Sequence, residues 1–174
     1  KEKAVPIEVY CGVDPASSLS IRADYFVIAT VGIDHENNKY VLDIVRQRVS
    51  PSKQPDLIID TYNKFKPRRM KIETTGYEKG LYIPGLEKGV KPRTRKSERL
   101  LSLVPMFARK QFYWRPEDIK GQQEFLSYPR GKHDDVMDGV WTALDGAKPC
   151  RLEEYDEKRY DKKKKKKFLD WLTM

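Results

Sequence analysis

Three apolar, β-branched runs within the first fifty residues constrain the fold of this 174-residue chain most strongly. They occupy residues 7–13, 24–33 and 40–49, and polar loops separate them. Short strands joined by short polar connections predict an antiparallel meander. Residues 51–65 follow with apolar side chains at helical spacing, and Pro67 would end this helix.

Strands and helices alternate after this point. The patterns predict strands over 70–74 and 111–114, a loop or short helix over 76–87, and helices over 97–109, 117–128 and 134–144. Pro105 should bend or split the helix over 97–109, because proline cannot donate a backbone hydrogen bond. A meander followed by this alternation predicts an α/β fold, with a mixed sheet of antiparallel and parallel strands and helices on both faces. That is the topology of the ribonuclease H-like fold.

The composition limits the classes of protein and site. No segment approaches the roughly 20 apolar residues of a membrane span, and the first residues lack the apolar core of a signal peptide, so we expect an intracellular protein with no membrane partner. Cys11 and Cys150 form no disulfide framework and should be reduced thiols. Because the chain has only two histidines, a zinc site of cysteine and histidine is not expected. A metal would be held by carboxylates, which favours Mg²⁺ or Mn²⁺.

The positive charge is concentrated in two stretches. The chain carries a net +9, and residues 88–132 hold twelve basic and four acidic residues. Residues 148–174 hold ten basic and six acidic residues, including six consecutive lysines at 162–167. We therefore expect one domain over 1–147, a flexible basic tail over 148–174, and an anionic partner such as nucleic acid.

Two carboxylates lie where predicted strands end. Asp14 follows the first strand and precedes Pro15, and Glu73 ends the strand over 70–74. In the predicted topology these strands are parallel neighbours, so the two carboxylates would lie side by side and repel unless a divalent cation lies between them. Asp14 could instead be a turn-forming aspartate, and Glu73 could pair with Lys71 or Arg69.

A third acidic group opens the last predicted helix. One aspartate would be enough to cap this helix, yet there are three, at Asp134, Asp135 and Asp138. Their spacing puts like charges on the same faces of the helix. On a helical wheel Asp134 and Asp138 flank the apolar stripe, whereas Asp135 points further from its centre. A helical wheel does not place side chains reliably in the first turn of a helix, so the choice of metal ligand among the three aspartates stays open. Two Mg²⁺ or Mn²⁺ ions on these carboxylates and on Asp14 and Glu73 could orient water for phosphodiester hydrolysis.

Five segments of the chain resemble, in order, a known family. They are Gly12–Ala16, Asp24–Ile28, Ile72–Tyr77, Lys96–Leu100 and Pro129–Asp138. Together they resemble the C-terminal nuclease domain of tailed-bacteriophage terminase large subunits, within the ribonuclease H-like superfamily. The likeness runs over residues 7–147, and its last segment is the most specific.

The resemblance implies a metal-dependent DNA endonuclease that cleaves concatemeric viral DNA during genome packaging, with little sequence specificity. Its metal-binding and catalytic acids would be Asp14, Glu73, Asp135 and Asp138, with Asp134 as a further metal ligand, and its cofactors two Mg²⁺ or Mn²⁺ ions. Contacts to DNA phosphates would come from the basic stretch, at Lys91, Arg93, Arg95, Lys96, Arg99 and Lys132.

The implied partners are double-stranded DNA, an ATPase motor domain, a portal and a small terminase subunit, in the cytoplasm of an infected bacterial host. The chain has no GxxxxGK[ST] motif and no room for the motor, so we expect an isolated nuclease domain. The alternatives are a Holliday-junction resolvase or transposase-like nuclease of the same fold, and a non-catalytic DNA-binding or assembly module.

Overall fold

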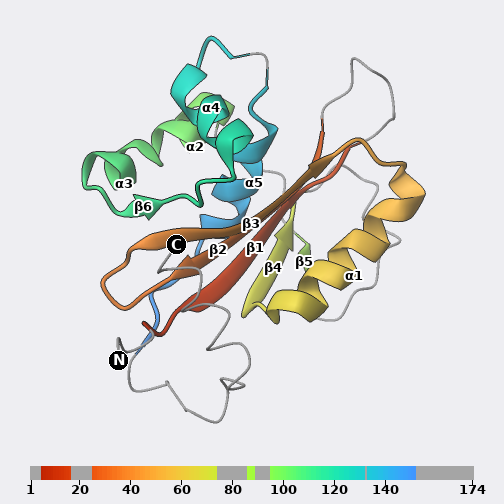
Figure 1. Cartoon of the computed structure of the whole chain (residues 1–174), viewed down its shortest axis with the longest axis horizontal. Coiled ribbons are helices and arrows are strands. Elements are labelled where there is room, and N and C mark those ends of the chain that lie inside the picture. Colours follow the sequence, from red (N-terminus) through yellow and green to blue (C-terminus); the bar gives the residue numbers. More distant parts are fainter. Residues whose placement is uncertain (1–4, 17–24, 74–85, 89–94, 132, 152–174) are drawn as a thin grey trace.

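One mixed sheet carries helices on both of its faces (Figure 1). The computed structural model describes residues 5–16, 25–73, 86–88, 95–131 and 133–151. The strands are β1 (Glu8–Asp14), β2 (Phe26–Ile33), β3 (Lys39–Gln47), β4 (Arg69–Ile72), β5 (Leu86–Lys88) and β6 (Phe112–Tyr113). The helices are η1 (Pro51–Lys53), α1 (Gln54–Phe65), α2 (Lys96–Leu101), α3 (Val104–Ala108), α4 (Ile119–Ser127) and α5 (Asp135–Leu144).

The described strands lie in the order β5-β4-β1-β2-β3-β6. Strands β1, β2 and β3 form the antiparallel meander that the sequence predicts. Strand β4 pairs with β1 in parallel, β5 with β4 in parallel, and β6 with the start of β3 in parallel. The mixed sheet and the pairing of the first and fourth strands are therefore confirmed.

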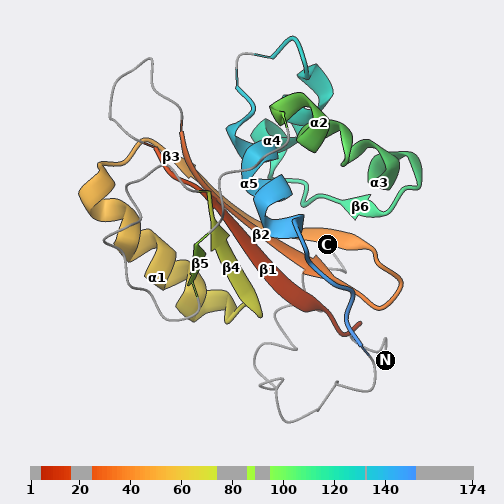
Figure 2. The same cartoon turned by 180° about the vertical axis from the view of Figure 1, so that it is seen from behind.

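The two faces of the sheet bury separate apolar clusters because side chains alternate along each strand. One cluster joins Ile28 of β2 to Ile58 of α1. The other joins Val27 of β2 to Val136 and Val140 of α5, and residues of α2 and α4 pack around it. Figure 2 shows α1 and α5 on opposite sides of the sheet. The prediction of helices on both faces is confirmed.

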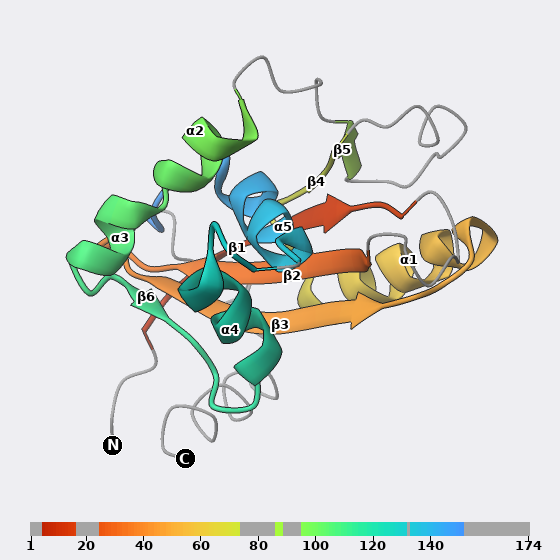
Figure 3. The same cartoon turned by 90° about the horizontal axis from the view of Figure 1, so that it is seen from above.

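Helix α5 approaches β1 unusually closely. A Cβ atom on Gly12 of β1 would lie 2.0 Å from the carbonyl oxygen of Gly139 and 2.3 Å from the backbone nitrogen of Ala143. Only glycine allows this backbone-to-backbone contact. Seen from above, α5 lies over β1 and β2 (Figure 3). The first turn of α5, with its aspartates, is thereby held beside the end of β1.

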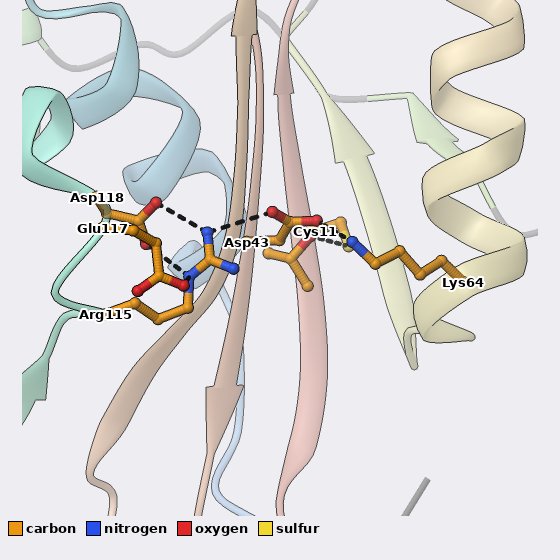
Figure 4. Close-up of polar contacts among 7 residues, drawn as sticks. Cys11, Asp43, Lys64, Arg115, Glu117 and Asp118 are labelled. Carbon is orange, nitrogen blue, oxygen red and sulfur yellow. Dashed lines mark hydrogen bonds and ion pairs between the residues drawn. The ribbon is translucent and has the colours of Figure 1, made fainter. Parts of the chain in front are cut away.

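Ion pairs through Asp43 of β3 connect the layers of the fold. The carboxylate accepts from Lys64 of α1 and from Arg115, whose Nη2 lies 3.3 Å from Asp43 Oδ1 and 2.8 Å from Asp118 Oδ1 (Figure 4). Arg115 also pairs with Glu117. These contacts fix the segment ahead of α4 against the edge of β3.

One element differs from those that the sequence predicts, and another follows the prediction. Residues 86–88 form strand β5, at the end of a region expected to be a loop or short helix; its backbone pairs with β4, which no local pattern shows. The helix over 97–109 is split into α2 and α3, as the sequence predicts, and Pro105 lies in the first turn of α3, where its missing backbone donor leaves no hydrogen bond unmade. No helix in the described part of the chain is long and apolar enough to cross a membrane.

Candidate active site

Asp14 and Glu73 lie together at one end of the sheet. Asp14 is the last residue of β1, and Glu73 directly follows β4. Their strands are parallel neighbours, with Val13 opposite Ile72, and the backbone nitrogen of Glu73 donates to the carbonyl oxygen of Val13 at 3.0 Å. The predicted adjacency of these two positions is confirmed.

The first turn of α5 adds two buried carboxylates. Asp135 and Asp138 are each only 4% exposed, whereas the side chain of Asp134 is 35% exposed. The wheel-based orientation of Asp134 and Asp135 was therefore wrong. Asp134 precedes the helix with φ of −141°, so helical geometry does not apply to it, and the inward position belongs to Asp135.

The carboxylates are close enough to disfavour one another's charge. The pKa of Asp14 is raised well above its usual range, first by burial and then by the negative charges of Asp138, Glu73 and Asp135. Burial also raises the pKa of Asp138, which Lys96 and Arg99 oppose. At the site formed by β1, β4 and α5, negative charges therefore outnumber positive charges around Asp14.

Two basic residues of α2 reach into this group. Lys96 Nζ lies 2.7 Å from Asp134 Oδ1 and 2.5 Å from Asp138 Oδ2. Arg99 is buried, with Nη1 3.3 Å from Glu73 Oε1 and Nη2 3.8 Å from Asp138 Oδ1. Helix α2 therefore links the acids that follow β4 to those of α5.

The alternative partners considered for Glu73 are engaged elsewhere. Lys71 forms an ion pair with Asp145, and Arg69 pairs with Glu87 while donating to the carbonyl oxygen of Asp145. Both therefore stabilise the junction between β4, β5 and the end of α5. Glu73 is held by Arg99 instead.

The chemistry of the donor set fits a hard divalent cation. Its members offer carboxylate oxygens, which Mg²⁺ and Mn²⁺ prefer, and the negative charges of the carboxylates around Asp14 would attract a cation. As the described side chains stand, no three His, Cys, Asp or Glu residues form a group close enough to hold an ion. Binding would require these side chains to move closer together.

The predicted DNA contacts fall into three groups. Arg95 and Lys96 are exposed at the start of α2. Arg99 is buried and directs its charge to Glu73 and Asp138. Lys91, Arg93 and Lys132 lie outside the described residues, as does the chain beyond Arg151.

Sequence reasoning missed Glu124 of α4. This buried carboxylate accepts from the backbone nitrogen of Val136, in the first turn of α5, at 2.9 Å, and its Oε1 lies 2.9 Å from Nε of Arg46. Burial raises the pKa of Glu124, and these two contacts oppose the rise. Glu124 therefore caps α5 from another helix, and no local signal could have identified it because the contact is tertiary.

Comparisons with known proteins find a matching family model and similar folds. A model of the terminase RNaseH-like domain family matches residues 11–121. The large terminase nuclease from thermophilic phage G20c superposes with a TM-score of 0.64 at 17% identity, over 82% of this chain and 83% of that one. The yeast mitochondrial Holliday-junction resolvase gives a TM-score of 0.49 at 15% identity, over 80% and 78% of the two chains. No curated protein matches the chain.

Proposed function

Because the chain belongs to the terminase RNaseH-like domain family, we propose that it is a metal-dependent endonuclease that hydrolyses phosphodiester bonds in DNA. The observation that carries the proposal is the convergence of Asp14, Glu73, Asp135 and Asp138 at one end of the sheet, where burial and like charge raise the pKa of Asp14. Such a set of oxygen donors is suited to divalent cations.

In the proposed site Asp14, Glu73, Asp135 and Asp138 would hold two Mg²⁺ or Mn²⁺ ions, with Asp134 as a further ligand. When bound, such ions activate a water nucleophile and stabilise the leaving oxygen of the phosphodiester. Arg99 orients Glu73 and Asp138 through its ion pairs. Lys96, which is 45% exposed, can swing from Asp138 toward a DNA phosphate.

The biological substrate we propose is concatemeric viral DNA, cut with little sequence specificity during genome packaging. Arg95 and Lys96 would contact its backbone from the start of α2, with Lys91, Arg93, Arg99 and Lys132 as further candidates. An ATPase motor domain, a portal and a small terminase subunit would be the partners in the cytoplasm of the infected host. The family match supports this assignment.

Cleavage of plasmid DNA tests the function. We expect the wild-type chain to degrade supercoiled and linear DNA with Mn²⁺ or Mg²⁺, and to leave both intact in EDTA. Asp14→Ala should abolish cleavage while its circular dichroism spectrum stays that of the wild type. Asp60→Ala is the matched control, because Asp60 is exposed on α1. Undiminished, metal-dependent cleavage by Asp14→Ala would overturn the site assignment, and preference for a four-way junction would favour a resolvase.

Metal binding provides a second readout that does not depend on cleavage. An ion that binds only the folded chain stabilises it by about 2.7 kcal/mol at a hundredfold excess over its Kd. We therefore expect Mn²⁺ to raise the melting temperature of the wild type and of Asp60→Ala. Asp14→Ala should show little or no rise.

A further inference from the structure

The start of helix α5 is capped by a side chain of another helix. Asp134 precedes α5, and its carboxylate pairs with Lys96, at 2.7 Å from Nζ, instead of capping the helix. Val136 is fully buried, so its backbone N–H cannot reach water and needs a partner in the protein. Oε2 of Glu124 accepts from this nitrogen at 2.9 Å. The first turn of α5 is therefore capped from α4, which lies beside it (Figure 3).

The capped nitrogen belongs to the peptide bond that follows Asp135. A peptide bond is planar, so a hydrogen bond that fixes the nitrogen of Val136 also fixes the direction of the backbone at Asp135. Asp135 is buried, and Asp138, which is also buried, lies in the same first turn. Both are ligands of the proposed metal site. The hydrogen bond to Glu124 therefore acts on the segment that carries these two carboxylates.

The close contact between α5 and β1 restrains a different part of the helix. It lies at Gly139 and Ala143, in the second and third turns. That contact sets the distance of the helix from the sheet. The end of a helix frays more readily than its middle, because its first N–H groups have no partner within the helix. A restraint on the first turn is therefore needed to hold two buried carboxylates in one arrangement.

Glu124 is itself anchored to the sheet. Its Oε1 lies 2.9 Å from Nε of Arg46 on β3. Strand register places Arg46 opposite Val27, and Val27 opposite Asp14. Residues directly opposite on antiparallel strands point to the same face, so Arg46 stands two strand spacings, about 10 Å, from Asp14 on the face that α5 covers. Glu124 thus connects the row of strand residues that contains Asp14 to the helix turn that contains Asp135.

We propose that Glu124 is a positioning residue of the metal site: by holding the backbone nitrogen of Val136, it keeps Asp135 in the arrangement that a divalent cation requires. This inference rests on the proposed nuclease function, since Asp135 is a metal ligand only under that function. Glu124 acts through the backbone of α5 and need not touch the metal or the DNA. Groups that orient metal ligands in this way contribute about 10- to 100-fold to metal affinity.

Two variants of Glu124 separate the reach of its side chain from its charge. Glu124→Asp keeps the negative charge but shortens the side chain by about 1.5 Å, so that the carboxylate no longer reaches the nitrogen of Val136. Glu124→Gln keeps the length and one acceptor oxygen. That oxygen should turn to the nitrogen of Val136, because Val136 is fully buried, whereas the side chain of Arg46 is 15% exposed and can reach water.

Calorimetric titration of Mn²⁺ into each folded variant, without DNA, measures the dissociation constant. We expect Glu124→Asp to bind Mn²⁺ about tenfold more weakly than the wild type, and Glu124→Gln to stay closer to the wild type than to Glu124→Asp. Ile58→Val is the matched control, because Ile58 is buried in the cluster on the opposite face of the sheet. It should lower stability in urea denaturation and leave the affinity for Mn²⁺ unchanged.

A wild-type dissociation constant for Glu124→Asp would overturn this inference. Weaker binding by Glu124→Gln than by Glu124→Asp would also overturn it, because charge and not reach would then control the affinity. An equal loss of affinity in Ile58→Val and Glu124→Asp would do the same, by showing that fold stability alone controls metal binding. In these three cases the proposed function stands, because the wild type binds Mn²⁺. A wild-type chain that binds no Mn²⁺ would overturn the proposed function and this inference with it.

Discussion

Replacing Gly12 by alanine tests how closely helix α5 must lie on strand β1 for the site to form. The new Cβ atom would lie 2.0 Å from the carbonyl oxygen of Gly139, whereas ordinary contacts begin at 3.4 Å. It would also lie 2.3 Å from the nitrogen of Ala143. Both neighbours are backbone atoms of one helix, so no side chain can rotate away and α5 itself must move.

The loss of folding stability caused by that movement can be given a magnitude. Overpacking a core costs about 1–3 kcal/mol and occasionally more. Helix α5 covers the apolar cluster around Val27 and would lift away from it. We therefore expect Gly12→Ala to lower the free energy of unfolding by about 3 kcal/mol. For a chain of this length, such a loss lowers the melting temperature by roughly 6–12 °C. The shift would also move Asp138 away from Asp14.

Urea denaturation of Gly12→Ala and Gly32→Ala provides the measurement. Gly32 is the matched control, since a Cβ atom there meets Cδ1 of Ile7 at 2.7 Å, and that flexible side-chain tip can rotate away. Alanine also favours a strand over glycine by about 0.5–1 kcal/mol, so Gly32→Ala should stay within about 1 kcal/mol of the wild type. Equal stability of the two variants would refute the argument that α5 needs this contact.

Three further predictions concern the charged groups. Folding raises the pKa of Asp14, so the protonated carboxyl stabilises the fold at low pH, and this stability is lost as the pH rises through the folded-state pKa. Asp14→Asn should therefore be more stable than the wild type at pH 8, and the difference should be smaller at pH 5. Urea denaturation in EDTA measures both differences. Glu124→Ala should lower the free energy of unfolding by about 3 kcal/mol in urea denaturation, because Arg46 loses its buried partner. A change below about 1 kcal/mol would contradict the capping role of Glu124. Lys96→Gln should tighten Mn²⁺ binding up to about fivefold in calorimetric titration, because it removes a partly exposed cation that competes at Asp138; weaker binding would show that Lys96 assists the metal.

The meander and the position of Asp14 beside Glu73 could be predicted because they depend on local patterns and general rules. Apolar alternation marks the strands, and a strand that returns after a helix pairs in parallel with the first. Both carboxylates follow such strands, so their adjacency needs no knowledge of side-chain packing.

The remaining parts of the site depend on contacts between distant residues. Whether Asp134 or Asp135 points inward depends on where α5 starts, and Glu124 of another helix holds that start. Arg46 and Arg48 look in the sequence like the solvent-facing residues of a strand. Only the fold brings them to Tyr25 and to the end of β1.

The order of the acids along the chain determines when the site can exist during synthesis. Asp14 and Glu73 leave the ribosome first, and Asp138 follows 65 residues after Glu73. At about 5–20 residues per second, this interval lasts roughly 3–13 s. Throughout it, a nascent chain holds two of its carboxylates without the helix that completes the set. During this interval a ribosome-bound chain lacks the assembled site, and under the proposed function it could cut DNA only once α5 has docked.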